Sequence, residues 1–177
     1  MKSLLRSLLK PLSFVPALLM MYLIFRLSAQ TGAESSEISI KTSRYLVATA
    51  GRFFHLGIDP AQAEEFAQKI HFYVRKMGHV TIYFLLAVSV SFPLYVYGLR
   101  GIWLVLTAGF LCVSYAVFDE YHQSFVEGRG PSVRDVYIDS FGSLIGIVIV
   151  QMVCFMGRMT IFRPLSNRRK TDGTERE

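Results

Sequence analysis

Four apolar runs follow one another along the chain, at residues 12–27, 80–97, 102–118 and 136–156. A helix that crosses a membrane needs about 20 mostly apolar residues, because it rises about 1.5 Å per residue through about 30 Å of hydrocarbon. Each run approaches that length, and a hydrophobic content of 52% is high for a soluble domain. The pattern predicts an all-α, polytopic membrane protein with four transmembrane helices, built as a single membrane domain over residues 1–177.

The stretch between the first two runs, residues 28–77, is polar enough to stay outside the bilayer and predicts an extracytoplasmic helical segment. We expect one helix over residues 36–54. A second helix should begin after Asp59, which can cap it, because Pro60 suits the first helical position and Gln62 completes a capping box. Apolar residues then recur on one face, at Phe66, Ile70, Tyr73 and Met77. This second helix either lies along the outer interface or continues directly into the second span, and the sequence leaves both open.

The chain carries a formal net charge of +6, and the placement of its basic residues favours one orientation in the membrane. Ten of the 19 Lys and Arg residues fall in segments that are cytoplasmic if the N-terminus is, including the tail at residues 157–177. Basic residues before the first span usually dominate orientation, and here they are Lys2, Arg6 and Lys10. We therefore expect a multi-pass protein of the cell membrane with both termini cytoplasmic. Its expected partners are membrane lipids, not nucleic acid.

The N-terminus also has a competing interpretation as a cleaved signal peptide, because an apolar run follows basic residues and ends in LSA at residues 27–29. The charge of Arg26 beside that site argues against cleavage, and an intact first span gives an even number of crossings. The two cysteines, Cys112 and Cys154, fall toward opposite ends of different spans. They predict no disulfide, and the sequence predicts no metal site and no cofactor.

Polar residues gather where the apolar runs end on the predicted outer side. The second run opens with a polar stripe, the third ends in acidic residues, a turn with an arginine between glycines follows, and two aspartates open the fourth. Charges at the lipid boundary are costly unless they have a partner or a purpose, so their accumulation favours a pocket. We expect one composite ligand-binding site of nine residues: Lys76, His79, Tyr83, Asp119, Glu120, Gln123, Arg129, Asp135 and Asp139.

The same residues also have a structural interpretation, as an ion-pair network at the membrane surface. Acidic groups at a helix C-terminus oppose the macrodipole, so Asp119 and Glu120 should attract a cation. The candidates are Arg129, Lys76 and Arg134. In this interpretation His79 forms a hydrogen bond with a backbone group or with Asp119. The lack of tight ligand spacing argues against a metal.

In the functional interpretation, the phosphate of a lipid or a lipid-linked glycan binds to Arg129 and Lys76, with Arg129 supplying fork geometry. His79, Asp119 and Glu120 then bind hydroxyl or amine groups, or act as acid and base.

A pair of small residues four positions apart, Gly142 and Gly146, lies further along the fourth span. Such a pair lets another helix approach closely. We expect it to serve helix packing, and it also offers a contact for oligomerisation.

The polar residues form an ordered set of short motifs. They are Lys76-x-x-His79-x-x-x-Tyr83, Asp119-Glu120-x-x-Gln123, Gly128-Arg129, Asp135, Gly142 and Gly146, preceded by FRLSAQ at residues 25–30. This set resembles the VanZ-like family of small polytopic bacterial membrane proteins, over most of the chain from Phe25 to Gly146. The sequence departs from that family at Asp139, where the family usually has Asn. The resemblance implies a VanZ-like domain of the cell envelope, associated with lowered susceptibility to the glycopeptide teicoplanin, and implies no particular activity.

Two classes of function stay open. The first is a noncatalytic envelope protein whose outward-facing polar site binds a lipid or lipid-linked headgroup. The second is a membrane enzyme that acts on such a headgroup by acid and base chemistry, with His79, Asp119 and Glu120 as catalytic candidates. The phosphatase pattern of Ser-Gly-His with a later Arg and a His-Asp dyad is missing, which disfavours the second class. Transport is a third class, which four short spans without an inverted repeat support poorly.

Overall fold

The computed structural model describes residues 11–157, and within this range the secondary structure is helical, with no strand. The helices are α2 (Val15–Ser28), α3 (Gly32–Phe53), α4 (Pro60–Val96), α5 (Gly101–Gln123) and α6 (Val133–Gly157). The all-α prediction is thereby confirmed. The basic residues before the first apolar run and in the tail from residue 158 onward lie outside the described residues.

Three of these helices, α4, α5 and α6, are long and apolar enough to cross a membrane. Helix α2 is apolar too, but its 14 residues give only about 21 Å along the axis. Helix α4 has 37 residues, or about 55 Å, and is therefore much longer than the hydrocarbon core is thick. The described part of the chain is that of a multi-pass membrane protein, with three long apolar helices and a shorter one.

Capping boxes set where α3 and α4 begin. Helix α3 starts at Gly32, four residues before the expected start, because Thr31 Oγ1 accepts from the Glu34 amide at 3.2 Å while the Glu34 carboxylate accepts from the Thr31 amide at 2.8 Å. The predicted cap of α4 is confirmed, with Asp59 and Gln62 bonded reciprocally. Helix α4 then continues without a break into the second apolar run, which decides between the two alternatives left by the sequence.

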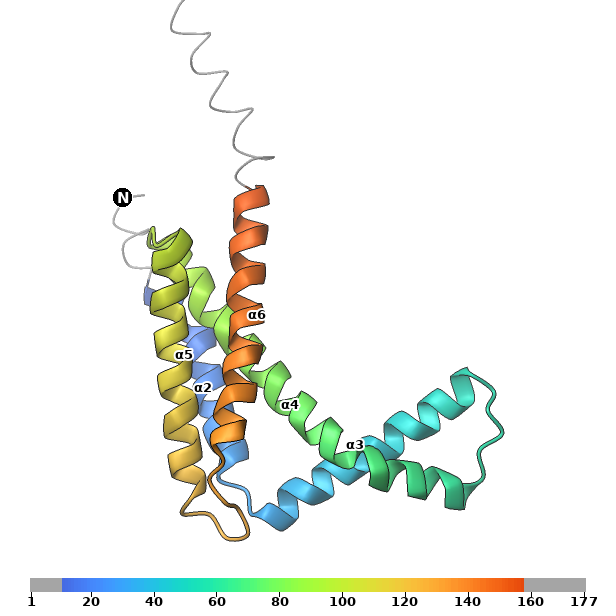
Figure 1. The fold of residues 1–177 in the computed structure, drawn as a ribbon. Helices are drawn as coiled ribbons and strands as arrows, with labels where there is room; N and C mark the ends of the chain where they lie inside the picture. The colour runs from blue at the N-terminus through green and yellow to red at the C-terminus, as the bar shows by residue number, and fades with distance from the viewer. Residues whose placement is uncertain (1–10, 158–177) are drawn as a thin grey trace, which may run out of the picture.

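The helices form a bundle with a projecting arm. In Figure 1, α5 and α6 stand side by side, α2 lies behind them, and α4 crosses obliquely. The most extensive helix contact is that between α4 and α6. The arm consists of α3 and the first half of α4, which cross each other at an angle (Figure 1) and are in contact. An ion pair joins its two helices, with Arg44 Nε 2.7 Å from Glu64 Oε2.

Two glycines of α6 explain how closely it packs against α4. A Cβ atom at Gly142 would lie 2.4 Å from the Val80 carbonyl oxygen, and one at Gly146 would lie 2.6 Å from the Phe84 carbonyl oxygen. Only glycine permits this approach of the two backbones. The predicted close helix contact is thereby confirmed. Its partner is α4 of the same chain, so this surface is already occupied within the chain.

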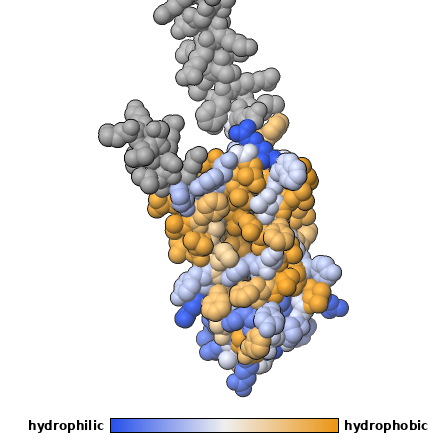
Figure 2. Space-filling model, turned by 90° about the vertical axis from the view of Figure 1, so that its left-hand side faces the viewer, coloured by the Kyte–Doolittle hydropathy of each residue, from blue (hydrophilic) through white to orange (hydrophobic). Residues whose placement is uncertain are grey.

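The bundle surface is rich in large apolar side chains, as a lipid-facing surface requires. Examples are Trp103, Leu106, Phe110, Phe141 and Val153, all exposed. Figure 2 shows hydrophobic residues gathered over the middle of the molecule and hydrophilic residues over its lower end. The lower end is where the loop between α5 and α6 lies (Figure 1).

Candidate functional site

The loop between α5 and α6 ties the lower end of the bundle together. The guanidinium of Arg129 donates from Nη2 to the Leu27 carbonyl oxygen and from Nη1 to Gln123 Oε1, each at 3.0 Å. The Gly32 amide donates to the Glu127 carbonyl oxygen at 3.0 Å. The loop thereby connects the C-terminal end of α2, the start of α3 and the end of α5. Arg129 occupies the turn as expected, but with partners that the sequence did not indicate.

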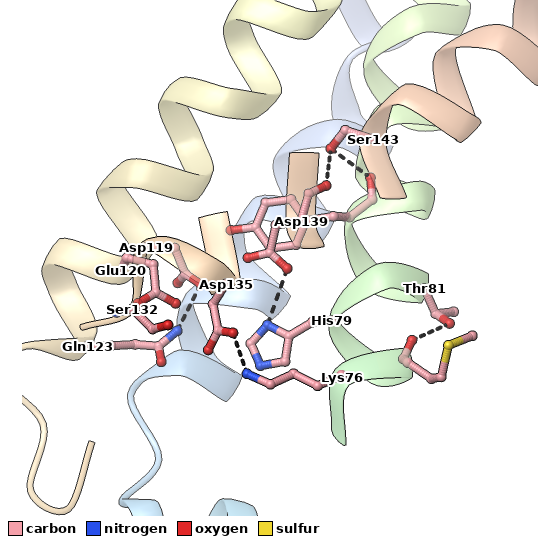
Figure 3. Close-up of polar contacts among 12 residues, drawn as sticks. Lys76, His79, Thr81, Asp119, Glu120, Gln123, Ser132, Asp135, Asp139 and Ser143 are labelled. Carbon is pink, nitrogen blue, oxygen red and sulfur yellow. Dashed lines mark hydrogen bonds and ion pairs between the residues drawn. The ribbon is translucent and has the colours of Figure 1, made fainter. Parts of the chain in front are cut away.

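The acidic residues at the end of α5 bind amide groups rather than a cation. Asp119 Oδ2 accepts from Gln123 Nε2 at 3.0 Å, which confirms that these two side chains share a helix face. Glu120 Oε2 accepts from the Ser132 backbone amide at 2.7 Å (Figure 3). No ion pair among residues 11–157 includes either acid, so the expectation of a directly paired cation is wrong there. Glu120 instead anchors the loop that precedes α6, because its carboxylate accepts the hydrogen bond from the Ser132 backbone amide.

An ion pair and a histidine–carboxylate contact join α4 to α6 beside this loop (Figure 3). Lys76 Nζ contacts Asp135 Oδ1, and His79 Nδ1 lies 3.3 Å from Asp139 Oδ1. The expected partner of His79 was Asp119 or a backbone group, so that expectation is wrong. Asp139 is fully buried, and neither of its oxygens has hydrogen-bond geometry with any described group, even though His79 is near. This carboxylate is the position at which the sequence departs from the VanZ-like pattern.

A cavity of about 220 Å³ opens beside these contacts, between α2, α3, α4, α5 and the loop. Five of the nine predicted site residues line it: His79, Tyr83, Asp119, Gln123 and Arg129. The other four do not line it: Lys76, Glu120, Asp135 and Asp139. The predicted composite site is therefore divided into a cavity and, on the side facing α6, a set of side-chain and loop contacts.

Several cavity residues were missed from the sequence. They are Ser28 at the end of α2, Gln30 in the turn that follows, Ser35, Ser39 and Thr42 from α3, and Arg75 from α4. The signals were present but unused, because Ser28 and Gln30 belong to the FRLSAQ stretch and the three α3 residues recur at spacings of four and three. Arg75 lies one residue before Lys76, so its side chain leaves the α4 axis in a different direction from that of Lys76.

Three buried polar atoms in the cavity wall lack hydrogen-bond partners among the described residues. They are Ser28 Oγ, Tyr83 Oη and Arg129 Nε. Buried polar groups in folded proteins almost always have a partner in the protein, a bound water or a ligand. All three atoms belong to residues that line one cavity, and Tyr83 also lies close enough to Asp119 to interact with its carboxylate.

The cavity also has an unusual charge distribution. Arg75 is half-buried in its wall, and no hydrogen bond or ion pair within residues 11–157 engages its guanidinium. Burial lowers the pKa of Arg129 from its usual range, and the positive charge of Arg75 lowers this pKa further, while Asp119 and Glu120 oppose the shift. An arginine does not lose its proton in proteins, so the two cations stay charged. Across the described residues, no three His, Cys, Asp or Glu side chains lie close enough to hold a metal ion.

Comparison with known proteins identifies the family. No curated protein and no solved structure matches the chain. The family model described as VanZ/LLP1 matches residues 13–155, which include every residue of the cavity wall. The earlier resemblance is thereby confirmed: the chain belongs to the VanZ/LLP1 family.

Proposed function

We propose that the protein is a four-span membrane protein of the cell envelope whose cavity binds the headgroup of a lipid or a lipid-linked envelope intermediate. In this proposal α2 is the first span, both termini are cytoplasmic, and the cavity opens on the outer side. Helix α3 and the first half of α4 then form the extracytoplasmic segment of a single VanZ-like domain. A short α2 is compatible with crossing, since a bilayer thins locally around a span of insufficient length.

The observation that carries the proposal is the mixed character of the cavity wall. Arg129, Gln123 and Ser28 present charged and hydrogen-bonding groups, whereas Ile24 and Ile82 present apolar surface. A ligand that suits both the polar groups and the apolar surface of the wall is an amphiphile with a polar head. The cavity is also lined by residues from the ends of α2 and α5 and from the loop, so in the proposed topology it lies where lipid headgroups meet hydrocarbon.

Family membership supports a role in the cell envelope. VanZ-like proteins are associated with lowered susceptibility to teicoplanin, so we include a contribution to glycopeptide tolerance in the proposal. The expected partners are membrane lipids and lipid-linked cell-wall intermediates.

One observation favours an enzyme as the second candidate. His79 lines the cavity, and its Nδ1 atom faces the buried carboxylate of Asp139 at 3.3 Å. A carboxylate behind a histidine orients the imidazole and leaves its other nitrogen available for proton transfer toward a ligand. Asp119 also lines the cavity, whereas Glu120 is bonded to the loop and lies outside the cavity wall. His79 and Asp119 are therefore better placed for catalysis than Glu120.

Lipid mass spectrometry of the purified full-length protein tests both candidates. We expect one anionic or lipid-linked class to be enriched in the purified protein relative to the membranes from which it was extracted. A lipid profile identical to that of the bulk membrane would contradict the binding proposal. Incubating the protein with the enriched lipid then separates the candidates, because conversion that is lost in His79→Ala indicates an enzyme and an unchanged lipid indicates a binder.

A further inference from the structure

Arg75 is a cation of the cavity that has no counterpart in the sequence-based site. Its neighbour Lys76 contacts Asp135, so that side chain is engaged on the side of α4 that faces α6. Arg75 lies on a different face of α4, because successive residues of a helix are about 100° apart. Arg75, Gly78, His79 and Ile82 recur at spacings of three, one and three, and all four line the cavity. The cavity-facing stripe of α4 therefore begins with an arginine.

The second guanidinium in the cavity is that of Arg129. Its two terminal nitrogens already donate to Gln123 and Leu27, whereas its Nε is buried without an acceptor among the described residues. Asp119, the acidic residue in the cavity wall, accepts from Gln123 and supplies one negative charge against the two arginines. Glu120 lies outside the wall but close enough to act on Arg129, whereas Arg75 has no ion-pair partner within residues 11–157. The unpaired charge of the wall is therefore that of Arg75, and an anion in the cavity would pair with it.

The hydrogen-bonding groups also suit an anion with several oxygens. Arg129 Nε and the Ser28 hydroxyl can each donate and have no hydrogen-bond partner within residues 11–157. The Tyr83 hydroxyl can donate either to the neighbouring Asp119 carboxylate or to a ligand. Arg75 adds the planar fork that binds two oxygens of one phosphate. A carboxylate has two oxygens and would leave part of this donor set unused. The cavity volume of about 220 Å³ suits a headgroup more than a whole lipid, since pockets for drug-sized ligands are roughly 300–1,000 Å³.

We propose that Arg75 and Arg129 form a two-guanidinium site for a phosphate group, with Ser28 and Tyr83 as additional donors. The inference rests on the proposed headgroup binding and specifies the chemistry of that headgroup. The phosphate belongs to an amphiphile whose apolar part contacts the isoleucines of the wall, such as Ile24 and Ile82. Lys76, which the sequence favoured as the second phosphate ligand, has a structural role in the contact between α4 and α6.

The test is lipid binding by the full-length protein in detergent, followed by native mass spectrometry. The probes are phosphatidic acid, which carries a phosphate monoester, phosphatidylglycerol, which carries a diester, and diacylglycerol, which has no phosphate. Inorganic phosphate is added as a competitor, so that a lipid-bound phosphate is distinguished from the free ion. The variant is Arg75→Gln, and the matched control is Arg134→Gln, because Arg134 is exposed and lies outside the cavity wall.

We expect both phosphate lipids to bind at least about tenfold more tightly than diacylglycerol, and Arg75→Gln to remove about tenfold or more of that affinity. Arg134→Gln should change it less than twofold. Arg75→Lys should recover part of the affinity, because lysine keeps the charge without the fork. An unchanged thermal midpoint of Arg75→Gln, measured in the same detergent, separates loss of binding from loss of folding.

Each of the other possible results contradicts a different part of the proposal. Equal affinity of Arg75→Gln and Arg134→Gln for phosphate lipids overturns the role of Arg75 and leaves headgroup binding intact. Equal affinity of the unaltered protein for diacylglycerol overturns the phosphate assignment. Binding of inorganic phosphate that depends on Arg75, with no lipid bound, supports the two-guanidinium site and contradicts the proposed lipid function.

Discussion

Two acidic residues of the same cluster, Glu120 and Asp139, are held in very different ways. Glu120 accepts a backbone hydrogen bond at 2.7 Å and keeps the loop in place. The Asp139 carboxylate is fully buried without a hydrogen bond to any described group, and His79 Nδ1 lies 3.3 Å from it. The first residue should therefore contribute to stability, and the second should reduce it.

Glu120→Ala is expected to destabilise the protein by about 1–3 kcal/mol, because the Ser132 amide loses its acceptor in a partly buried place. Thermal unfolding in detergent micelles measures the effect. Glu127→Ala is the matched control, since Glu127 is exposed in the same loop and contributes its backbone carbonyl to the contact with Gly32. Equal midpoints for the two variants would contradict the anchoring role of Glu120.

Asp139→Asn is expected to raise stability by about 1–2 kcal/mol, because a neutral amide needs no compensating charge when buried. Asp135→Asn should instead lower stability, since it breaks the contact with Lys76. Both variants are compared with the unaltered protein in the same thermal unfolding measurement. A loss of stability in Asp139→Asn as large as that in Asp135→Asn would indicate that the contact of the Asp139 carboxylate with His79 is required for the fold.

At this scale the sequence predicted some of the residues that line the cavity, but not the arginine that α4 contributes to it. Helical spacing correctly put His79 and Tyr83 in one place, and both line the cavity. The same spacing grouped Lys76 with them, but His79 lies at the border between two faces of α4. One face carries Lys76 toward α6, and the other carries Arg75 toward the cavity. Periodicity gives the faces of a helix, whereas the neighbour that each face meets depends on the packing of distant segments.

Helices show a similar division between what local sequence determines and what packing determines. The capping residues of α4, Asp59 and Gln62, were recognised because a capping box involves residues three apart. The uninterrupted passage of α4 from the arm into the bundle was not decided by the sequence, since an amphipathic stripe suits either an interfacial helix or a continuous one. The part that α3 plays in the cavity was missed because it depends on the arm folding back against α4.

The contact between α4 and α6 gives a prediction at the scale of the helices. Gly142→Ala is expected to destabilise the protein by about 1–3 kcal/mol, because its Cβ would lie 2.4 Å from the Val80 carbonyl oxygen and push the helices apart. Gly109→Ala is the control, as Gly109 lies within α5 with no atom of another element within 4 Å of an added Cβ. It should be neutral or stabilising by up to about 1 kcal/mol, since alanine favours a helix over glycine.

Chemical unfolding of both variants in mixed micelles provides the comparison. Similar unfolding free energies for Gly142→Ala and Gly109→Ala would show that α4 and α6 do not approach as closely as described.

At the scale of the whole molecule, the loop and the arm meet at one end of a set of apolar helices (Figure 1), and both contribute residues to the cavity wall. The opposite end holds the turn between α4 and α5 and the end of α6. Such polarity gives the molecule two chemically different ends, which suits a protein that presents a site on one side of a membrane.

Orientation is tested by cysteine accessibility in intact cells, in a background that carries Cys112→Ala and Cys154→Ala. Gly130→Cys is expected to react with an impermeant thiol reagent from outside, since Gly130 lies in the loop with open space around it. Gly157→Cys, at the far end of α6, should react only after the membrane is permeabilised. The nearby Gly128 is unsuitable for a cysteine substitution, because its φ of 71° would strain any residue other than glycine. The reverse labelling pattern would contradict the proposed topology.

The central claim, that the cavity holds a phosphate headgroup between two arginines, is tested most directly by a crystal structure of the protein grown in a lipid mesophase. We predict a tetrahedral group in the cavity within hydrogen-bond distance of both Arg75 and Arg129, with Ser28 and Tyr83 as further donors. A cavity that contains only water, with Arg75 paired to an acidic side chain of the same chain, would contradict the claim.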